Sequence, residues 1–324
     1  MKESEIMKKE LVICGLTAKV GEKKQGFIKI LDTETQMPAT IINGVNEGKT
    51  ILITAGVHGC EYPCIKAAMD LGKEIDPKKV SGQIIIIHPV NTQGFLGRNA
   101  AIVPEDNKNI LRVFPGNKNG TISEKIAYVI THELQDKADF YFDLHGGDLH
   151  EDLLPHIYYP GVGDSKVTEA SIEIAKCFNV PYFIRSNTTN GTYTSAAIRG
   201  VPSLLIERGG CGLCKEEDVN EYKKDILNVL ATLNVLEHKI TENKYSPLEL
   251  NEGEYVNALN SGCWKCFVKV GQYIKEGEKL GEVTDYFGNV IDVYYAKFNG
   301  VVLYNTISFS VSKDSSLIAY GRIN

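Results

Sequence analysis

The chain has 324 residues, and its contents of 43% hydrophobic and 23% charged residues are ordinary for a folded globular protein. It carries 35 Lys and Arg against 41 Asp and Glu, and this net charge of −6 argues against nucleic acid or an anionic membrane surface as the main partner. An apolar run such as Ile84–Ile87 is far shorter than the ~18 residues that a membrane span needs.

In chain order, the first ~45 residues contain short alternating segments that predict strands. From residue 49 on, buried strands alternate with amphipathic helices. This alternation predicts an α/β fold, with a mostly parallel sheet covered by helices on both faces. Strands are expected at 50–56, 83–90, 139–144 and 202–206, and helices at 61–73, 123–136 (with Ser123 as N-cap), 164–178 and 218–236.

The pattern changes again near residue 245, which divides the expected domains 1–245 and 246–324. The second stretch has no helical period, and its short strands separated by glycines predict a small all-β domain. Its hairpins resemble the barrel-sandwich hairpins of lipoyl and biotinyl carriers. A carrier role is not expected, because the candidate hairpin tip at 285–289 contains no lysine. We expect this part to shape the mouth of the cleft or an oligomer contact.

The cellular environment is expected to be the cytoplasm. Residues 1–15 are charged and contain no apolar core of a signal peptide. Eight Cys in 324 residues is below the density of a disulfide scaffold. The pairs Cys211/Cys214 and Cys263/Cys266 could together form a structural zinc site, but their long separation favours separate buried thiols.

Chemically useful side chains follow the predicted strands of the larger domain. His58 and Glu61 follow the first buried strand, His145 ends the third, and Glu207 ends the fourth. Because ligands of open α/β sheets bind beyond the carboxyl ends of the strands, these residues are expected to meet. Two His and one Glu are a typical ligand set of catalytic zinc with an open position for water, which leaves Glu207 as a general base.

Four segments carry a resemblance to a known family, the succinylglutamate desuccinylase/aspartoacylase family, which is related to the zinc carboxypeptidases. Residues 56–61 (GVHGCE) resemble its G-x-H-G-x-E motif, and residues 143–147 (DLHGG) resemble its D-L-H-G segment. Residues 202–210 and 104–116 are similar to its P-x-x-x-x-E-x-G segment and its P-x-D-G-x-N-L-N-R-x-F-P-G run. The resemblance extends from residue ~45 to residue 324.

The resemblance implies the zinc-carboxypeptidase-like fold and one Zn²⁺ per chain, bound by His58, Glu61 and His145. It implies Glu207 as the base that takes a proton from water and gives it to the leaving nitrogen. Arg98 would polarise the scissile carbonyl. The residues implied for substrate binding are Arg112 and Asn109.

One residue departs from the family pattern. The family has Asn before the substrate-binding Arg, whereas Leu111 stands before Arg112 here, and Leu cannot hydrogen-bond a carboxylate. Aspartoacylases also have an Arg ten residues before the catalytic Glu, where this chain has Ala197. Arg185 and Arg199 could substitute, although solvation at the surface is the favoured interpretation. Strict specificity for an acidic N-acyl amino acid is therefore not expected.

The leading hypothesis is a zinc-dependent hydrolase that cleaves the amide, or the ester, of a small N-acyl amino acid. A metallocarboxypeptidase for short peptides is a second hypothesis of the same class. A zinc-binding or ligand-binding homologue with weak turnover is a third hypothesis, and Glu207 argues against it because a pure binder needs no base. The sequence leaves a homo-oligomer open.

Overall fold

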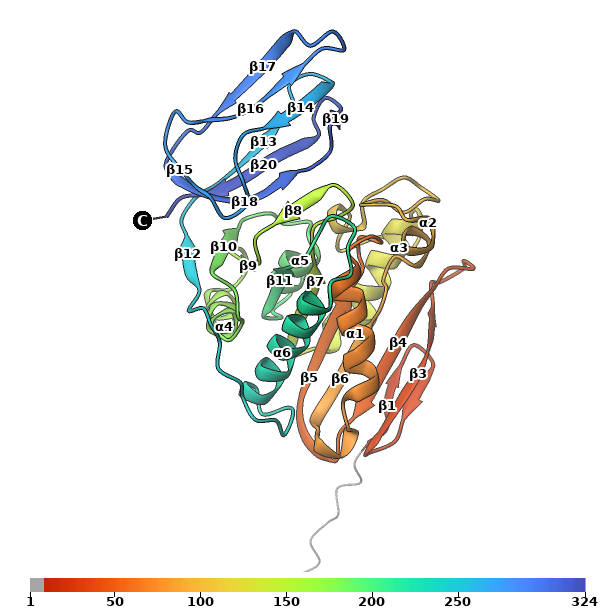
Figure 1. Cartoon of the computed structure of the whole chain (residues 1–324). Coiled ribbons are helices and arrows are strands. Elements are labelled where there is room, and N and C mark those ends of the chain that lie inside the picture. The colour runs from red at the N-terminus through yellow and green to blue at the C-terminus, as the bar shows by residue number, and fades with distance from the viewer. Residues whose placement is uncertain (1–8, 324) are drawn as a thin grey trace, which may run out of the picture.

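The buried strands expected from the sequence lie in one nine-stranded sheet (Figure 1). The computed structural model describes residues 9–323, so the first eight residues of the charged N-terminal stretch lie outside the described part. In spatial order the strands are β12 (Leu248–Leu250), β10 (Tyr182–Ser186), β9 (His156–Pro160), β11 (Ser203–Glu207), β7 (Phe140–His145), β5 (Asn46–Ala55), β6 (Ser81–Ile87), β4 (Gln36–Asn43) and β3 (Glu22–Lys29).

Neighbouring strands of this sheet run parallel except at the pairs β9–β11, β6–β4 and β4–β3. The predicted α/β fold is therefore confirmed with a mixed sheet: β11, β7, β5 and β6 are parallel as expected, whereas β9, β10 and β12 run the other way and the β3–β4 edge is antiparallel. Side chains alternate between the two faces, so Ile51 and Ile53 of β5 enter one core while Leu52 enters the other. Each face thus has its own apolar core.

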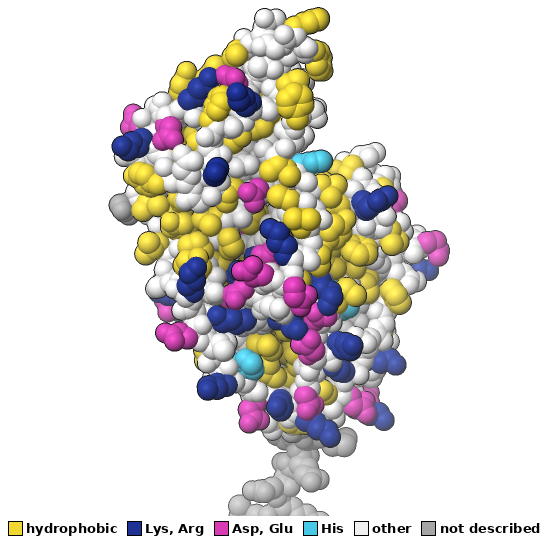
Figure 2. Space-filling view, in the orientation of Figure 1, with side chains coloured by type: hydrophobic (Ala, Val, Ile, Leu, Met, Phe, Trp, Pro, Cys, Tyr) yellow, Lys and Arg dark blue, Asp and Glu magenta, His cyan; other side chains and the backbone are white. Residues whose placement is uncertain are grey.

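Helices cover both faces, as predicted. The helices α1 (Tyr62–Glu74), α4 (Ser165–Ala175) and α6 (Glu216–Thr232) contribute to one core. The helices α3 (Ile122–Val129) and α5 (Thr192–Ile198), together with the hairpin β1 (Leu11–Ile13) and β2 (Leu16–Ala18), contribute to the other core. Short helical segments lie at α2 (Thr92–Gly97), Pro77–Lys79 and Ile110–Arg112. Figure 2 shows basic and acidic side chains interspersed over the face that carries α1 and α6.

The helical stretch predicted over 123–136 is present, but its N-cap is Thr121 and not Ser123, and it is α-helical only as far as Val129. The backbone N–H of Thr121 donates to the Glu124 carboxylate at 2.7 Å, so the helix begins one residue before Ser123. The Ser123 hydroxyl instead donates to Asp106 at 2.8 Å. The α-helix ends at Val129, and a π-helical turn (Ile130–Leu134) and a 3-10 turn (Gln135–Lys137) continue the chain.

Other boundaries differ by a few residues. The strand expected at 83–90 ends at Ile87, and the helix expected at 164–178 ends at Ala175. The sequence did not predict β9, β10, α2 or α5. These elements have five to seven residues, and so short a segment shows too little of a helical or strand period to be identified.

The C-terminal part consists of two antiparallel sheets, which confirms the expected small all-β, barrel-sandwich-like part. One contains β13 (Gly253–Asn257), β20 (Ser316–Gly321), β18 (Gly300–Thr306) and β15 (Tyr273–Ile274). The other contains β17 (Val290–Tyr295), β16 (Lys279–Thr284), β14 (Gly262–Cys266) and β19 (Ser310–Val311). Trp264 and Phe298 belong to their shared core. The loop at 285–289 joins β16 to β17, as expected.

Two short strands connect the C-terminal part to the larger part. Strand β12 pairs with β10 at the edge of the nine-stranded sheet, although it follows residue 245. Strand β8 (Glu151–Leu153), which precedes residue 245, pairs with β18 of the C-terminal sheet. The division into domains at residue 245 stays a prediction. Within residues 9–323, no helix is long and apolar enough to cross a membrane.

A buried ion pair fixes the end of β11, where the sheet reaches the candidate site. The Arg208 guanidinium donates to Asp225 at 2.7 Å and to the carbonyl of Asn179 at 3.2 Å. Asp225 also accepts the backbone N–H of Asn179 at 2.8 Å. Burial raises the pKa of Asp225 to about 6 although Arg208 opposes this shift, so the pair is ionised at pH 7. Arg208 directly follows Glu207, so α6 holds this strand end in place.

We expect Asp225→Ala to lower the free energy of unfolding by about 3–5 kcal/mol, because it leaves a buried guanidinium unpaired. The control is Asp136→Ala, which removes a partner of the more exposed Arg199 and should cost at most about 1 kcal/mol. Urea unfolding of both variants measures the difference. Equal losses would contradict the importance of the buried pair.

Candidate active site

The loop that carries His58 and Glu61 joins the carboxyl end of β5 to α1. Gly56 has a φ of +72°, a conformation that favours glycine, and it turns the chain out of the strand. A Cβ on Gly59 would lie 2.3 Å from the backbone of Gly94, so the absence of a side chain lets the loop pack on α2. Glu61 is the N-cap residue of α1. The two glycines of the motif are thus sterically required to place both functional side chains.

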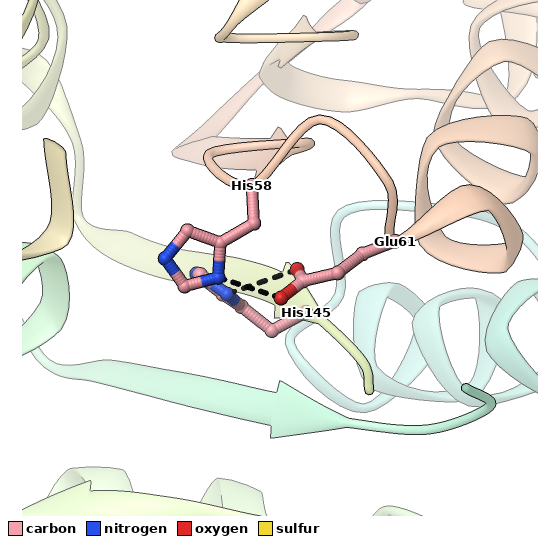
Figure 3. Close-up of side chains that lie close together, drawn as sticks. All are labelled: His58, Glu61 and His145. Carbon is pink, nitrogen blue, oxygen red and sulfur yellow. Dashed lines mark hydrogen bonds and ion pairs between the residues drawn. The ribbon is translucent and has the colours of Figure 1, made fainter. Parts of the chain in front are cut away.

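His145 approaches the same carboxylate from the neighbouring strand β7, of which it is the last residue. The Nδ1 atom of His58 lies 2.6 Å from Glu61 Oε1, and the Nδ1 atom of His145 lies 3.1 Å from Glu61 Oε2 (Figure 3). The three residues offer ligand atoms that all lie within 4.8 Å of one another. Within the described residues this is the one such group that could hold a metal ion.

The other ring nitrogen of each histidine is bound to an acceptor. Nε2 of His145 lies 2.9 Å from Asp143 Oδ2, and Nε2 of His58 lies 3.1 Å from Asn109 Oδ1. The Oδ1 atom of Asn109 also accepts the backbone N–H of Leu111 at 2.8 Å, which identifies it as the amide oxygen. Both Nε2 atoms therefore carry a proton, so a metal ion that displaced any proton on Nδ1 would meet two Nδ1 lone pairs that face Glu61.

The charges of the site favour a bound cation. Burial alone would raise the pKa of Glu61, but His145 and His58 outweigh it and lower the pKa to about 2. Burial alone would lower the pKa of His145, but Asp143 and Glu61 outweigh it and raise the pKa well above the ordinary range. Glu61 Oε2 is buried, and its 3.1 Å approach to His145 lacks hydrogen-bond geometry. A metal ion would satisfy Oε2 and both Nδ1 atoms.

Glu207 lies beside this cluster at the end of β11. In the sheet its backbone is opposite His145 on one side and opposite His156 on the other. Its Oε2 atom is buried and has no hydrogen-bond partner among the described residues. Burial raises the pKa of Glu207 well above the usual range, and the neighbouring Glu61 charge adds to the shift while His145 opposes it. A buried carboxyl group with a shifted pKa and an unpartnered oxygen is a candidate for proton transfer.

His58, Glu61 and Glu207 line a cavity of about 630 Å³. Asn109, Leu111, Arg112 and Arg185 also line it. Leu111 is 9% exposed and presents only hydrocarbon where the family pattern has an amide. Arg199 pairs with Asp136 and does not line the cavity, in agreement with the surface role that we expected from the sequence. Arg185, in contrast, lines the cavity.

Arg98 is not among the cavity-lining residues. It ends α2 in a left-handed conformation, and its side chain is exposed. Its charge acts on Cys60 and Tyr62, which lie in and next to the His58–Glu61 loop. Arg98 therefore lies close to the site without reaching into the cavity.

The sequence interpretation missed three side chains that complete the site. Asp143 is fully buried; it binds His145 and accepts the hydroxyls of Thr54, at 2.5 Å, and Thr192. Its two-residue spacing from His145 on one strand was a usable signal, because such residues share a face. Glu151 and His156 also line the cavity. No pattern in the sequence indicated them.

Two sequence features do not take part. Asn91 follows the second buried strand and caps α2 by accepting the Gly94 N–H at 2.8 Å, so it does not reach the cavity. The two CxxC pairs do not join in one cluster within the described chain. All eight cysteines are free. The expectation of buried thiols is wrong for these two pairs, because Cys211, Cys263 and Cys266 are half-buried and Cys214 is exposed.

The chain belongs to the succinylglutamate desuccinylase/aspartoacylase family. The profile of the succinylglutamate desuccinylase/aspartoacylase catalytic domain matches residues 47–233, more than half of the chain. This span contains His58, Glu61, His145 and Glu207. The family resemblance carried by the four motifs is confirmed.

Several relatives resemble the chain over nearly its whole length. A deacetylase of N-alpha-acetyl-L-2,4-diaminobutyric acid from Halomonas elongata is 27% identical over 316 residues, which cover 93% of this chain and 92% of the relative. A product-bound structure of the ectoine utilization protein EutE (DoeB) from Ruegeria pomeroyi has a TM-score of 0.86 at 23% sequence identity. The superposition covers 97% of this chain and 98% of the Ruegeria chain. A crystal structure of a succinylglutamate desuccinylase/aspartoacylase from Rhodobacter sphaeroides has a TM-score of 0.83 at 24% sequence identity. The superposition covers 93% of this chain and 95% of the Rhodobacter chain.

The geometry predicts one divalent metal ion per chain at His58, Glu61 and His145. We expect His58→Ala to lose stoichiometric binding, because one of three ligand atoms disappears. His132→Ala is the matched control, since this histidine lies on α3's continuation beside Asp136 and does not line the cavity. Elemental analysis of metal-loaded, desalted protein measures the content. Undiminished metal in the His58 variant would exclude the site.

Proposed function

We propose that the protein is a zinc-dependent deacylase that cleaves the amide bond, or the ester bond, of a small N-acyl amino acid in the cytoplasm. The observation that carries this proposal is the Glu61 carboxylate between two histidine Nδ1 atoms, with Glu207 at the adjacent strand end. Family membership and the deacetylase relative support the reaction class.

The donor set supports zinc. Two imidazole nitrogens and one carboxylate match the ligands of catalytic zinc sites, whereas Mg²⁺ and Ca²⁺ prefer oxygen ligands alone. Zinc held there would keep an open position and lower the pKa of bound water to about 7. Asp143 and Asn109 would keep both rings oriented, as hydrogen-bonded partners behind metal ligands do.

Glu207 is the proposed base. Its unpartnered Oε2 atom can take the proton of the attacking water and then pass it to the leaving nitrogen. Burial raises the pKa of this carboxyl group, which favours its holding the proton until the leaving nitrogen accepts it. Arg112 is proposed to pair with the substrate carboxylate, and Asn109 to support it from the cavity wall. Arg98 is proposed to turn towards the carbonyl oxygen.

The cavity favours a small substrate over a peptide. Tyr255 and Asn257 of β13 and Ser316 of β20 line it together with the residues of the larger part. We propose that residues 246–324 act as a unit that limits the length of the substrate. The volume of about 630 Å³ lies within the range of small-molecule sites.

Glu207→Gln should lower kcat by at least ~100-fold, since the amide cannot accept the proton of water. The metal content should stay unchanged, because Glu207 is not among the three ligands. Steady-state kinetics on N-acetyl amino acids and elemental analysis of the same sample separate the two effects. Turnover close to wild type would remove Glu207 from the role of base, and parallel loss of metal would make it a ligand.

Leu111→Asn should raise kcat/KM for acidic N-acyl amino acids relative to neutral ones. A new donor to a charged group is worth about 1.5–3 kcal/mol, which is roughly 10- to 100-fold. Leu111→Met keeps the side chain apolar at similar volume and is the control. A wild-type preference for N-acetylaspartate above ~1,000-fold would contradict the role of Leu111.

A further inference from the structure

The cavity has an acidic wall beside the candidate metal site, formed by Glu151 and Asp148. The Glu151 carboxylate has one long contact, 3.4 Å from the backbone N–H of Asp148, and within residues 9–323 no ion pair includes it. Burial, together with the charges of Asp148 and Glu61, raises the pKa of Glu151 to about 7. Among the described residues Glu151 therefore has no ion-pair partner, and the charge of His58 and the backbone N–H of Asp148 only partly oppose the rise of its pKa.

The backbone holds Glu151 in place from three directions. Its carbonyl accepts the N–H of Cys211 at 2.8 Å. A Cβ on Gly147 or Gly210 would lie 2.5 or 2.2 Å from this carbonyl oxygen, so both glycines allow the close approach. Strand β8 places Glu151 opposite Thr306 of β18. Glu151 is therefore built into the wall where the loops after β7 and β11 meet the C-terminal sheet.

His156 gives an independent sign of a missing ligand group in the same cavity. The side chain is 1% exposed, and its Nδ1 atom donates to the carbonyl of Leu154 at 2.7 Å. Burial lowers the pKa of His156 to about 4, so the ring is neutral at pH 7 and Nε2 is a hydrogen-bond acceptor. Nε2 is buried and has no partner among the described residues. Buried polar atoms normally have a hydrogen-bond partner. A donor group of a ligand would supply this partner for Nε2.

We propose that Glu151, Asp148 and His156 bind the ammonium group at the end of the substrate's side chain, so that N-acyl derivatives of short diamino acids are preferred. This inference rests on the proposed deacylase function and specifies its substrate class. An ammonium group has three N–H donors and no acceptor, and it suits a wall that offers only acceptors. A side-chain carboxylate would meet like charge there. Arg112, whose charge acts on Tyr193 and Tyr255, remains for the substrate carboxylate.

The test compares two substrates of nearly equal shape, Nα-acetyl-L-2,4-diaminobutyrate and Nα-acetyl-L-norvaline, which differ by an ammonium against a methyl group. We expect kcat/KM of the metal-loaded wild type to favour the cationic compound by at least about 10-fold. Glu151→Gln should reduce this ratio by roughly 10- to 100-fold. The readout is the ratio of the two kcat/KM values and not either value alone, because the charge of Glu151 also acts on Glu207 and a change there affects both substrates alike.

Two further variants make the assignment specific. His156→Asn can keep a donor to the Leu154 carbonyl while removing the Nε2 acceptor, and it should also lower the ratio. Asp152→Asn is the matched control, because this neighbouring carboxylate is exposed and does not line the cavity. It should leave the ratio unchanged. Calorimetric titration with the free amino acids L-2,4-diaminobutyrate and L-norvaline gives a readout without turnover, in which the same two site variants should weaken only the diamino acid.

The outcomes separate this inference from the proposed function. If the wild type hydrolyses the norvaline compound at least as well as the diamino compound, the ammonium site is overturned and the deacylase stands. A preference that survives in both Glu151→Gln and His156→Asn overturns it as well. If no N-acyl amino acid is hydrolysed but diamino acid binding still depends on Glu151, the deacylase proposal fails and the ammonium site stands. Circular dichroism verifies that each variant is folded.

Discussion

The candidate site depends on one carboxylate, Glu61, held between the Nδ1 atoms of two histidines from neighbouring strands. Asp143 and Asn109 bind the opposite ring nitrogens and so direct both lone pairs towards Glu61. The buried Glu61 carboxylate favours positive charge on the His145 ring, and a metal ion in place of the Nδ1 proton would supply such charge. The rest of the larger part can be understood as a scaffold that keeps these residues together: parallel strands bring the side chains to one edge, and glycines let the loops pack closely.

The chain balances charge in separate regions of one cavity. A metal ion would face Glu61 in the loop after β5, while Glu207, the proposed base, has an unpartnered oxygen at the end of β11. Arg112 brings positive charge to the cavity, and Glu151 brings negative charge that nothing in the described chain pairs. Because charges in a partly buried cavity are weakly screened, their distribution selects the charge of the ligand. Leu111 fits this arrangement, since it removes a donor for an additional carboxylate.

The C-terminal sheets complete the cavity as well as adding a second core. Strand β8 belongs to the larger part but pairs with β18 of the C-terminal sheet. This pairing places Glu151 at the boundary between the two parts. Tyr304 of β18 and Tyr255 of β13 line the same cavity. In the proposed deacylase, a cavity lined by both parts of the chain would exclude long substrates and would let the C-terminal part influence specificity.

The sequence by itself determined the parallel α/β architecture, the small all-β part and the identity of His58, Glu61, His145 and Glu207 as neighbours. These features follow from local rules, because buried strands have a clear apolar pattern and the carboxyl ends of parallel strands meet at one edge. Only the tertiary structure showed that Arg98 lies outside the cavity and that Asn109 is hydrogen-bonded to His58. It also showed that Glu151 and His156 line the cavity wall. The directions of those side chains depend on strand register and on contacts between distant segments, such as β8 with β18 and β9 with β11, and no local pattern in the sequence encodes such contacts.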